Sequence, residues 1–271
     1  MNRSKWDRRI ERADGLAAAH PFAAEVLQFY KRMTMFQQTL YSHGVGAGRN
    51  ESGKRVSGLL QQDLNVHLLL AKFTEFLSTV ETCAPQPIAQ SARDLIAQGT
   101  ERWQDLLTSF WHNAPDFEPS PEQPEVLLAW IFLQPRAEYL ADHNGHIFRQ
   151  ETLAVCPFCS GKPIVGVLRP EGDGAKRSLV CSMCATEWAY GRIMCPACSE
   201  EAVEKLAIYT ASQFDYVRVE ACETCRHYIK TVDLTKDGHA VPVVDELATM
   251  PLNLWAQQHG YAKLQANLLG I

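Results

Sequence analysis

Eight of the nine cysteines fall between residues 156 and 225, in four Cys-x-x-Cys pairs of identical form. The pairs are Cys156 with Cys159, Cys181 with Cys184, Cys195 with Cys198, and Cys222 with Cys225. A Cys-x-x-Cys turn places two sulfurs on one side of a tight bend, and two such turns supply the four thiolates of a tetrahedral metal site. A disulfide framework is the usual alternative, but it is typical of exported chains. The spacing therefore predicts two metal sites.

The lengths between the pairs favour one way of combining them. The intervals between the first and second pairs and between the third and fourth are 21 and 23 residues, whereas the central interval is 10. Pairing first with second and third with fourth gives two similar units, each a ribbon of strands between two turns. The cross-braced arrangement, first with third and second with fourth, also satisfies the chemistry. We expect the sequential pairing.

Four thiolates close the coordination sphere, so we expect structural or electron-carrying sites rather than Lewis-acid catalysis. A tetrathiolate site contributes on the order of 10–16 kcal/mol, as much as the ~5–15 kcal/mol net stability of a typical domain. Without metal the cysteine-rich region should lose its fold. Zinc and iron both accept four sulfurs in this geometry, and spacing does not distinguish them.

Many metal-binding turns carry glycine directly after the second cysteine, because the backbone there has a positive φ. Here those positions hold Ser160, Ala185, Ser199 and Arg226, and a glycine, Gly161, comes one residue late in the first turn. We therefore expect turns that depart from that geometry.

The elements that position the cysteines change in character along the chain. Residues 20 to about 150 have helical periodicity, with one apolar stripe of Leu60, Leu64, Leu68, Phe73, Phe76, Leu77 and Val80 and another of Val26, Leu27, Tyr30, Met33, Phe36, Gln37 and Leu40. Shorter helices are expected at 88–98, 102–112 and 122–143, the last kinked or split at Pro135. The Gly-rich segment 44–54 is expected to be a loop, because it lacks a phosphate-binding pattern.

From 154 to about 235 the pattern becomes short β-rich runs separated by turn residues, which predicts hairpins. A closing helix follows, with Asp245 as its expected N-cap. The expected organisation is a helical domain at 1–150, a first ribbon at 151–194, a second ribbon at 195–240, and a C-terminal helix and tail at 241–271.

Composition excludes several classes of function. The 271 residues are 46% hydrophobic and 21% charged, which is typical of a folded chain. Residues 151–271 carry 11 Lys and Arg against 14 Asp and Glu, an acidic balance that disfavours nucleic-acid binding by the ribbons. The longest apolar run, residues 126–133, is far short of the ~20 residues of a membrane span. Arg8 and Arg9 are not followed by the apolar region of an export signal, so we expect a cytoplasmic protein.

The connecting motifs make the pattern more specific. They are CPFCSGKP (156–163), LVCSMCATEWAYGRIMCPAC (179–198), VEACETCRHYIKTVDL (219–234) and DELATMPLNLWAQQHGYAK (245–263). With these motifs the sequence resembles the FdhE family of formate dehydrogenase accessory proteins over most of its length. It departs from the family's more frequent Cys-Gly-Ser at Cys159-Ser160-Gly161, which puts the local turn in question but leaves the cysteines intact.

The resemblance implies an α+β fold, in which a helical N-terminal bundle precedes two rubredoxin-like or zinc-ribbon-like β modules and a C-terminal helix. It implies a non-enzymatic maturation factor, or chaperone, that binds the catalytic subunit of a formate dehydrogenase, without nucleic acid or membrane insertion. Self-association is compatible with it. Its cofactors would be two tetrathiolate-bound metal ions, iron of the rubredoxin type or zinc, held by the eight cysteines.

Three residues between the second and third pairs are candidate partner contacts: Glu187, Trp188 and Arg192. Arg and Trp are frequent hot-spot residues. The alternative is that Trp188 packs between the ribbons and the charges pair locally. Redox-active iron that passes or senses electrons is an alternative function, and a dithiol oxidoreductase is disfavoured because four copies of the turn occur in hairpin context.

Overall fold

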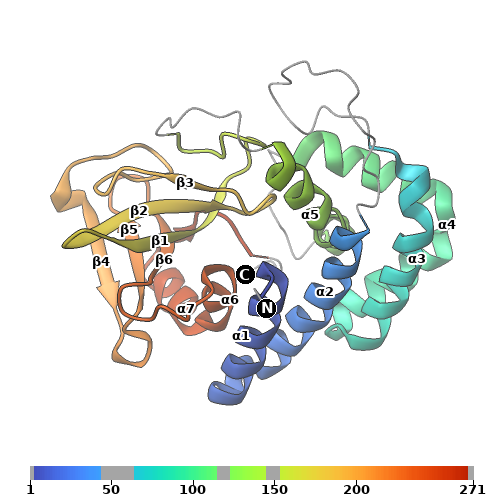
Figure 1. Cartoon of the computed structure of the whole chain (residues 1–271), viewed down its shortest axis with the longest axis horizontal. Coiled ribbons are helices and arrows are strands. Elements are labelled where there is room, and N and C mark those ends of the chain that lie inside the picture. The colour runs from blue at the N-terminus through green and yellow to red at the C-terminus, as the bar shows by residue number, and fades with distance from the viewer. Residues whose placement is uncertain (1–2, 44–63, 115–122, 145–152, 268–271) are drawn as a thin grey trace.

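The computed structural model describes residues 3–43, 64–114, 123–144 and 153–267, and the expected loop at 44–54 lies outside these ranges. Five helices come first in the chain: α1 (Lys5–Ala19), α2 (Ala24–Ser42), α3 (Val66–Cys83), α4 (Gln86–Asn113) and α5 (Pro124–Asn144). The strands are β1 (Pro163–Glu171), β2 (Gly174–Cys181), β3 (Glu187–Ala189), β4 (Leu206–Thr210), β5 (Val217–Cys222), β6 (His227–Asp233) and β7 (Ala262–Lys263), with α6 (Pro242–Ala248) and α7 (Met250–Gln258) between β6 and β7. Figure 1 shows the helices α2–α5 at one end and the sheet at the other, which confirms the predicted α+β class.

The apolar stripes predict the helical core with one error. Phe73, Phe76, Leu77 and Val80 of α3 are fully buried, as expected, but Leu68 is 61% exposed. The helix instead turns Val66 and Leu69 inward. Leu60 lies outside the described residues. The stripe on α2 is correct in the main: Leu27, Tyr30, Met33, Gln37 and Leu40 are all buried.

Pro135 does not split its helix, because α5 runs without interruption from Pro124 to Asn144. A proline removes the hydrogen bond to the carbonyl four residues earlier, which is that of Ile131. The side-chain amide of the buried Gln37 on α2 donates to this carbonyl at 2.7 Å. The one polar position in the α2 stripe therefore compensates for the proline in α5. Among the described residues every helix is too short or too polar to cross a membrane.

A single mixed sheet contains all seven strands, in the order β3-β2-β1-β6-β5-β4, with β7 beside β6. Neighbours are antiparallel except where β6 runs parallel to β1 and to β7. The β1–β6 contact joins the strands of the two expected ribbons. Gly166 on β1 permits this contact, because a Cβ there would overlap the side chain of Thr231 on β6.

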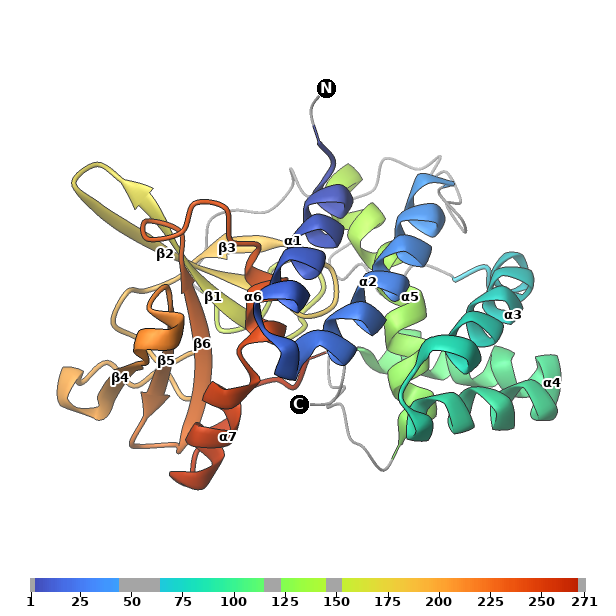
Figure 2. The same ribbon diagram turned by 90° about the horizontal axis from the view of Figure 1, so that it is seen from below.

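The closing helix is two short helices, α6 and α7, and Asp245 is not the N-cap. Val241 occupies that position and Pro242 begins the helix. Asp245 lies one turn after Val241, and its carboxylate accepts a hydrogen bond from the backbone N–H of Val241 at 2.6 Å. Figure 2 shows α1 and α6 side by side between the sheet and helices α2–α5.

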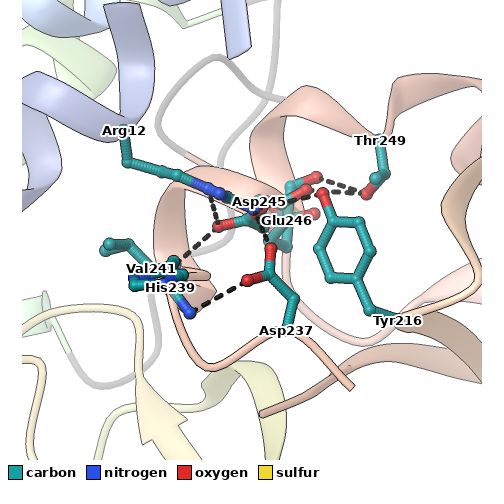
Figure 3. Close-up of polar contacts among 8 residues, drawn as sticks. All are labelled: Arg12, Tyr216, Asp237, His239, Val241, Asp245, Glu246 and Thr249. Carbon is teal, nitrogen blue, oxygen red and sulfur yellow. Dashed lines mark hydrogen bonds and ion pairs between the residues drawn. The ribbon is translucent and has the colours of Figure 1, made fainter. Parts of the chain in front are cut away.

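Arg12 of α1 joins the helical half to α6 through a buried carboxylate (Figure 3). Its guanidinium donates to Asp245 at 3.0 Å from Nε and 2.5 Å from Nη2, and to Asp237 at 2.7 Å. Asp245 is fully buried and also accepts from the Tyr216 hydroxyl at 2.9 Å. Burial raises the pKa of Asp245 despite these donors. The charge on this carboxylate therefore depends on Arg12.

The next residue, Glu246, lies at the centre of a second buried ion cluster. Its carboxylate pairs with Lys230 of β6 at 3.0 Å and Lys263 of β7 at 2.5 Å, and the side chains of Lys230 and Glu246 are fully buried. Burial opposes ionisation, but the charges of Lys230 and Lys263 lower the pKa of Glu246 to about 2. Two consecutive acidic residues of α6 thus attach it to different elements.

The shift at Glu246 predicts an acid-dependent loss of stability. Because its pKa falls from an ordinary 4.5 to about 2 in the fold, its ionisation stabilises the fold above pH 4.5, and this contribution disappears as the pH falls toward 2. It amounts to about 3 kcal/mol. Urea denaturation measures the free energy of unfolding of the unmodified protein and of Glu246→Gln. The difference between the two should shrink by about 3 kcal/mol as the pH falls from 4.5 toward 2. A difference independent of pH would contradict the assignment.

Candidate metal centres

The structure groups the eight cysteines into two sets of four. The first cysteine cluster is Cys156, Cys159, Cys181 and Cys184, and the second cysteine cluster is Cys195, Cys198, Cys222 and Cys225. In each cluster the four sulfurs lie within 4.8 Å of one another. The sequential pairing is therefore confirmed, and the cross-braced arrangement is excluded.

The sulfur separations fit a metal rather than disulfides. The Sγ–Sγ distances are 3.3 Å for Cys159–Cys181, 3.6 Å for Cys156–Cys184 and 3.7 Å for Cys198–Cys222. Metal–sulfur bonds of about 2.3 Å give a tetrahedron with edges of roughly 3.8 Å. All nine cysteines are free thiols. The clusters have the donor type and size for zinc or iron, and neither is distinguished by these distances.

Four non-glycine residues have a positive φ in the part of the chain that the structure describes, and each directly follows the second cysteine of a Cys-x-x-Cys pair. The φ values are 62° for Ser160, 54° for Ala185, 60° for Ser199 and 59° for Arg226. The expectation that the turns depart from the left-handed geometry is therefore wrong: the backbone keeps it in all four. In the turns of Ser160, Ser199 and Arg226 the residue with positive φ donates its N–H to the carbonyl of the first cysteine, at 2.9 Å in each case.

Backbone N–H groups also point at the sulfurs. Phe158 donates to Cys156 Sγ, Met183 to Cys181 Sγ and Ala197 to Cys195 Sγ, each at 3.4 Å. Such bonds stabilise thiolate charge around a metal. Gly161 has a separate role, because a Cβ there would lie 3.2 Å from Cys181 Sγ and 3.4 Å from Cys159 Sγ. The late glycine therefore leaves room for the sulfurs of the first cluster.

Left-handed backbone costs a non-glycine residue about 1 kcal/mol or more, so glycine in these positions should stabilise the chain. Ala185→Gly should raise the free energy of unfolding of the metal-loaded protein by up to about 1 kcal/mol, after the larger unfolded-state entropy of glycine is subtracted. Ala197 lies inside another of the turns without positive φ, so Ala197→Gly is the matched control and should give no gain. Urea denaturation measures both. Equal effects would contradict the conformational explanation.

The two clusters differ in their surroundings. All four cysteines of the first cluster are buried in the hydrophobic core that also contains residues of α2–α5. The side-chain amide of Gln134 on α5 donates to the carbonyl of Ser182 in the turn at 2.7 Å. In the second cluster Cys198 is exposed and Cys225 is half-buried. The first cluster thus joins the helical half to the sheet, whereas the second faces solvent.

Burial raises the pKa of the Cys181 and Cys184 thiols, so in the absence of a cation these sulfurs keep their protons. A bound divalent metal reverses this, because its charge stabilises the thiolates that ligate it. Metal binding at the first cluster would therefore be coupled to proton release inside the core.

The three candidate partner contacts lie in different environments. Trp188 is buried and donates from Nε1 to the carbonyl of Leu153 at 2.8 Å. Glu187 forms a two-point ion pair with Arg169, at 2.8 and 2.7 Å. Arg192 is exposed and lines a hollow beside the second cluster. Of the three, only Arg192 lines this hollow, and its Nη1 donates to the carbonyl of Ala175 at 3.4 Å.

The sequence did not reveal two sets of residues that the fold brings together. One is the ion pair of Arg12 with Asp245, whose partners are 233 residues apart. The other is the hollow that Arg192 lines together with Arg177, Ile208, Arg218 and Glu220. Alternation along one strand predicts that Arg218 and Glu220 share a face of the sheet. Only the register between β4 and β5, which pairs Ile208 with Glu220, adds Ile208 to that face.

Comparisons with known proteins agree with this arrangement. Residues 155–192 match the model of the FdhE central domain, and residues 193–269 match that of the FdhE C-terminal domain. The "Protein FdhE homolog" of Aquifex aeolicus is 37% identical over 141 residues, 51% of this chain and 50% of that protein. The homolog of Haemophilus influenzae strain PittGG is 24% identical over 97% of this chain and 87% of its own length. The match to the Aquifex relative thus spans about half of its length.

The fold is shared with a solved structure. The crystal structure of the FdhE protein from Pseudomonas aeruginosa has a TM-score of 0.71 and 22% sequence identity, covering 99% of this chain and 97% of that one. At this identity the likeness concerns the fold. Residues 155–269, which include both cysteine clusters, thus match the central and C-terminal domains of the FdhE family, and FdhE homologs align with nearly the whole chain.

Proposed function

We propose that this protein is a cytoplasmic accessory factor that binds the catalytic subunit of a formate dehydrogenase during maturation and is needed for its activity. The match of residues 155–269 to the FdhE central and C-terminal domains carries the proposal. The two clusters of four free cysteines support a non-enzymatic role, because four thiolates on one metal leave no coordination position for a substrate. We propose the eight cysteines as the ligands, with zinc or iron as the metal.

The first experiment tests binding and requirement separately. The full-length, tagged protein, purified with its metal under anaerobic conditions, is used to capture the formate dehydrogenase catalytic subunit from the same organism. Formate dehydrogenase activity is then measured in cells that lack the gene and in cells that carry it on a plasmid. The proposal expects a stable complex and restored activity. If the proposal is wrong, no complex forms and the plasmid does not restore formate dehydrogenase activity.

A second candidate function is electron transfer or redox sensing by iron, and the exposure of Cys198 in the second cluster favours it. A solvent-facing sulfur gives an electron partner access to the site. This function requires visible absorption that bleaches reversibly with reductant. A colourless, zinc-loaded protein that restores full formate dehydrogenase activity would exclude it.

A further inference from the structure

A hollow of about 220 Å³ opens on the sheet beside the second cysteine cluster. Its base is the face of β4 and β5 that carries Ile208, opposite Glu220 in the strand register. The neighbouring pair, Tyr209 and Val219, belongs to the other face, where Tyr209 packs against Trp255 of α7 at 4.5 Å between ring centroids. Helix α7 therefore covers one face of this part of the sheet (Figure 1), and the hollow lies on the other.

The rim of the hollow exposes large apolar side chains. Ile193 is 52% exposed, Val203 is 65% exposed and Ile208 is 57% exposed, and all three line the same hollow. Single exposed apolar residues are ordinary on a protein surface, whereas a contiguous group around a concave site is typical of a binding surface. The hollow is therefore suited to an apolar ligand segment.

The charged residues that line the hollow are predominantly basic: Arg177, Arg192 and Arg218 against Glu220 alone. Glu220 accepts from Arg177 at 2.6 Å and from Arg218 at 2.6 and 2.8 Å, so its carboxylate is already shared by two guanidiniums. Arg177 is held in place by further bonds to the carbonyls of Gly191 and Met194. Arg192 and Arg218 thus supply local positive charge in the hollow, whereas a divalent metal with four thiolates in the adjoining second cluster would carry two negative charges.

The strand beside the hollow is at the end of the sheet. Among the strands that the structure describes, β4 pairs with β5 alone. An extended peptide can add to such an edge through main-chain hydrogen bonds, while alternate side chains reach the adjoining surface. For β4 that surface is the hollow, whose far wall includes Pro196 and Ala197 of the second cluster.

We propose that this surface, the β4 hollow, binds an extended segment of a partner protein in which an aspartate or glutamate is flanked by apolar residues. The carboxylate would lie against Arg192 and Arg218, and the apolar side chains against Ile193, Val203 and Ile208. This inference rests on the proposed function, since it assigns the segment to the catalytic subunit that the protein matures.

Capture experiments with the metal-loaded, full-length protein test the surface. Ile208→Glu and, independently, Arg192→Glu should each reduce capture of the catalytic subunit by about tenfold or more, because each places a carboxylate against the incoming one. Leu254→Glu is the matched control: Leu254 is 60% exposed on α7, the helix at the opposite face. It should leave capture unchanged. Circular dichroism and metal content establish that all three variants fold.

A photo-crosslinking amino acid at position 208 identifies the occupant. The expected product joins position 208 to a segment of the catalytic subunit that has an acidic residue among apolar ones. Normal capture by both Ile208→Glu and Arg192→Glu would overturn the inference while the proposed function stands, and so would a crosslink only to a basic segment. If the unmodified protein captures no catalytic subunit, both the inference and the proposed function are wrong.

Discussion

Cys181→Ser should prevent the sheet and the helical half from assembling into a stable protein. The substitution removes one ligand from the first cysteine cluster, whose four cysteines are buried in the core shared with α2–α5. A structural tetrathiolate metal contributes on the order of 10–16 kcal/mol, which equals or exceeds the usual net stability of a domain. We expect loss of one metal ion per chain, together with aggregation or a collapse of the urea midpoint. Metal analysis and urea denaturation measure these losses.

Cys198→Ser is the control for this prediction, because Cys198 is the exposed ligand of the second cluster. It should also lose one metal ion but remain folded, with the helices and the first cluster intact. By the same reasoning, a chelator should remove metal from the second cluster first. If the two substitutions destabilise the protein equally, the proposed division between a core site and a surface site is wrong.

Arg12→Met should destabilise the protein by about 3–5 kcal/mol, because it leaves the buried carboxylate of Asp245 without its cation. Asp245 is fully buried, and Arg12 is its ion-pair partner from the helical half (Figure 3). Urea denaturation gives the change in free energy. The double variant Arg12→Met with Asp245→Asn should recover part of the loss, since it removes the unpaired charge.

An exposed ion pair serves as the control. Lys31 of α2 pairs with Asp14 of α1 at 2.6 Å, and the Asp14 side chain is half exposed. Lys31→Met should cost less than about 1 kcal/mol. Equal costs for Arg12→Met and Lys31→Met would show that the Arg12–Asp245 contact does not hold the two halves together as proposed.

The cysteine clusters were predictable because their signal is local. Each Cys-x-x-Cys pair is formed by residues three apart, and the similar lengths of the two ribbons favour the correct pairing. Their turns show the limit of residue preference as a guide: Ala185 and Arg226 adopt positive φ without glycine. A metal that fixes the positions of both cysteines would outweigh a local cost of about 1 kcal/mol per turn.

The remaining errors concern long-range contacts. The parallel contact of β1 with β6 depends on Gly166 meeting Thr231, which no local pattern indicates. Periodicity predicts helices only from residue 20, yet Ser4 and Asp7 form a capping box that begins α1, a signal visible in the sequence. Asp245 has the residue type of an N-cap but serves instead as the buried partner of Arg12, because tertiary ion pairing overrides the local preference. The assigned domain limits and metal ligands stay predictions.

The central claim is that the eight cysteines form two closed four-sulfur metal sites, and X-ray absorption at the metal edge tests it most directly. The anaerobically purified full-length protein, quantified for metal, should contain two ions per chain, each with four sulfur neighbours at about 2.3 Å. One ion per chain, or nitrogen or oxygen atoms in the coordination shell, would contradict the account.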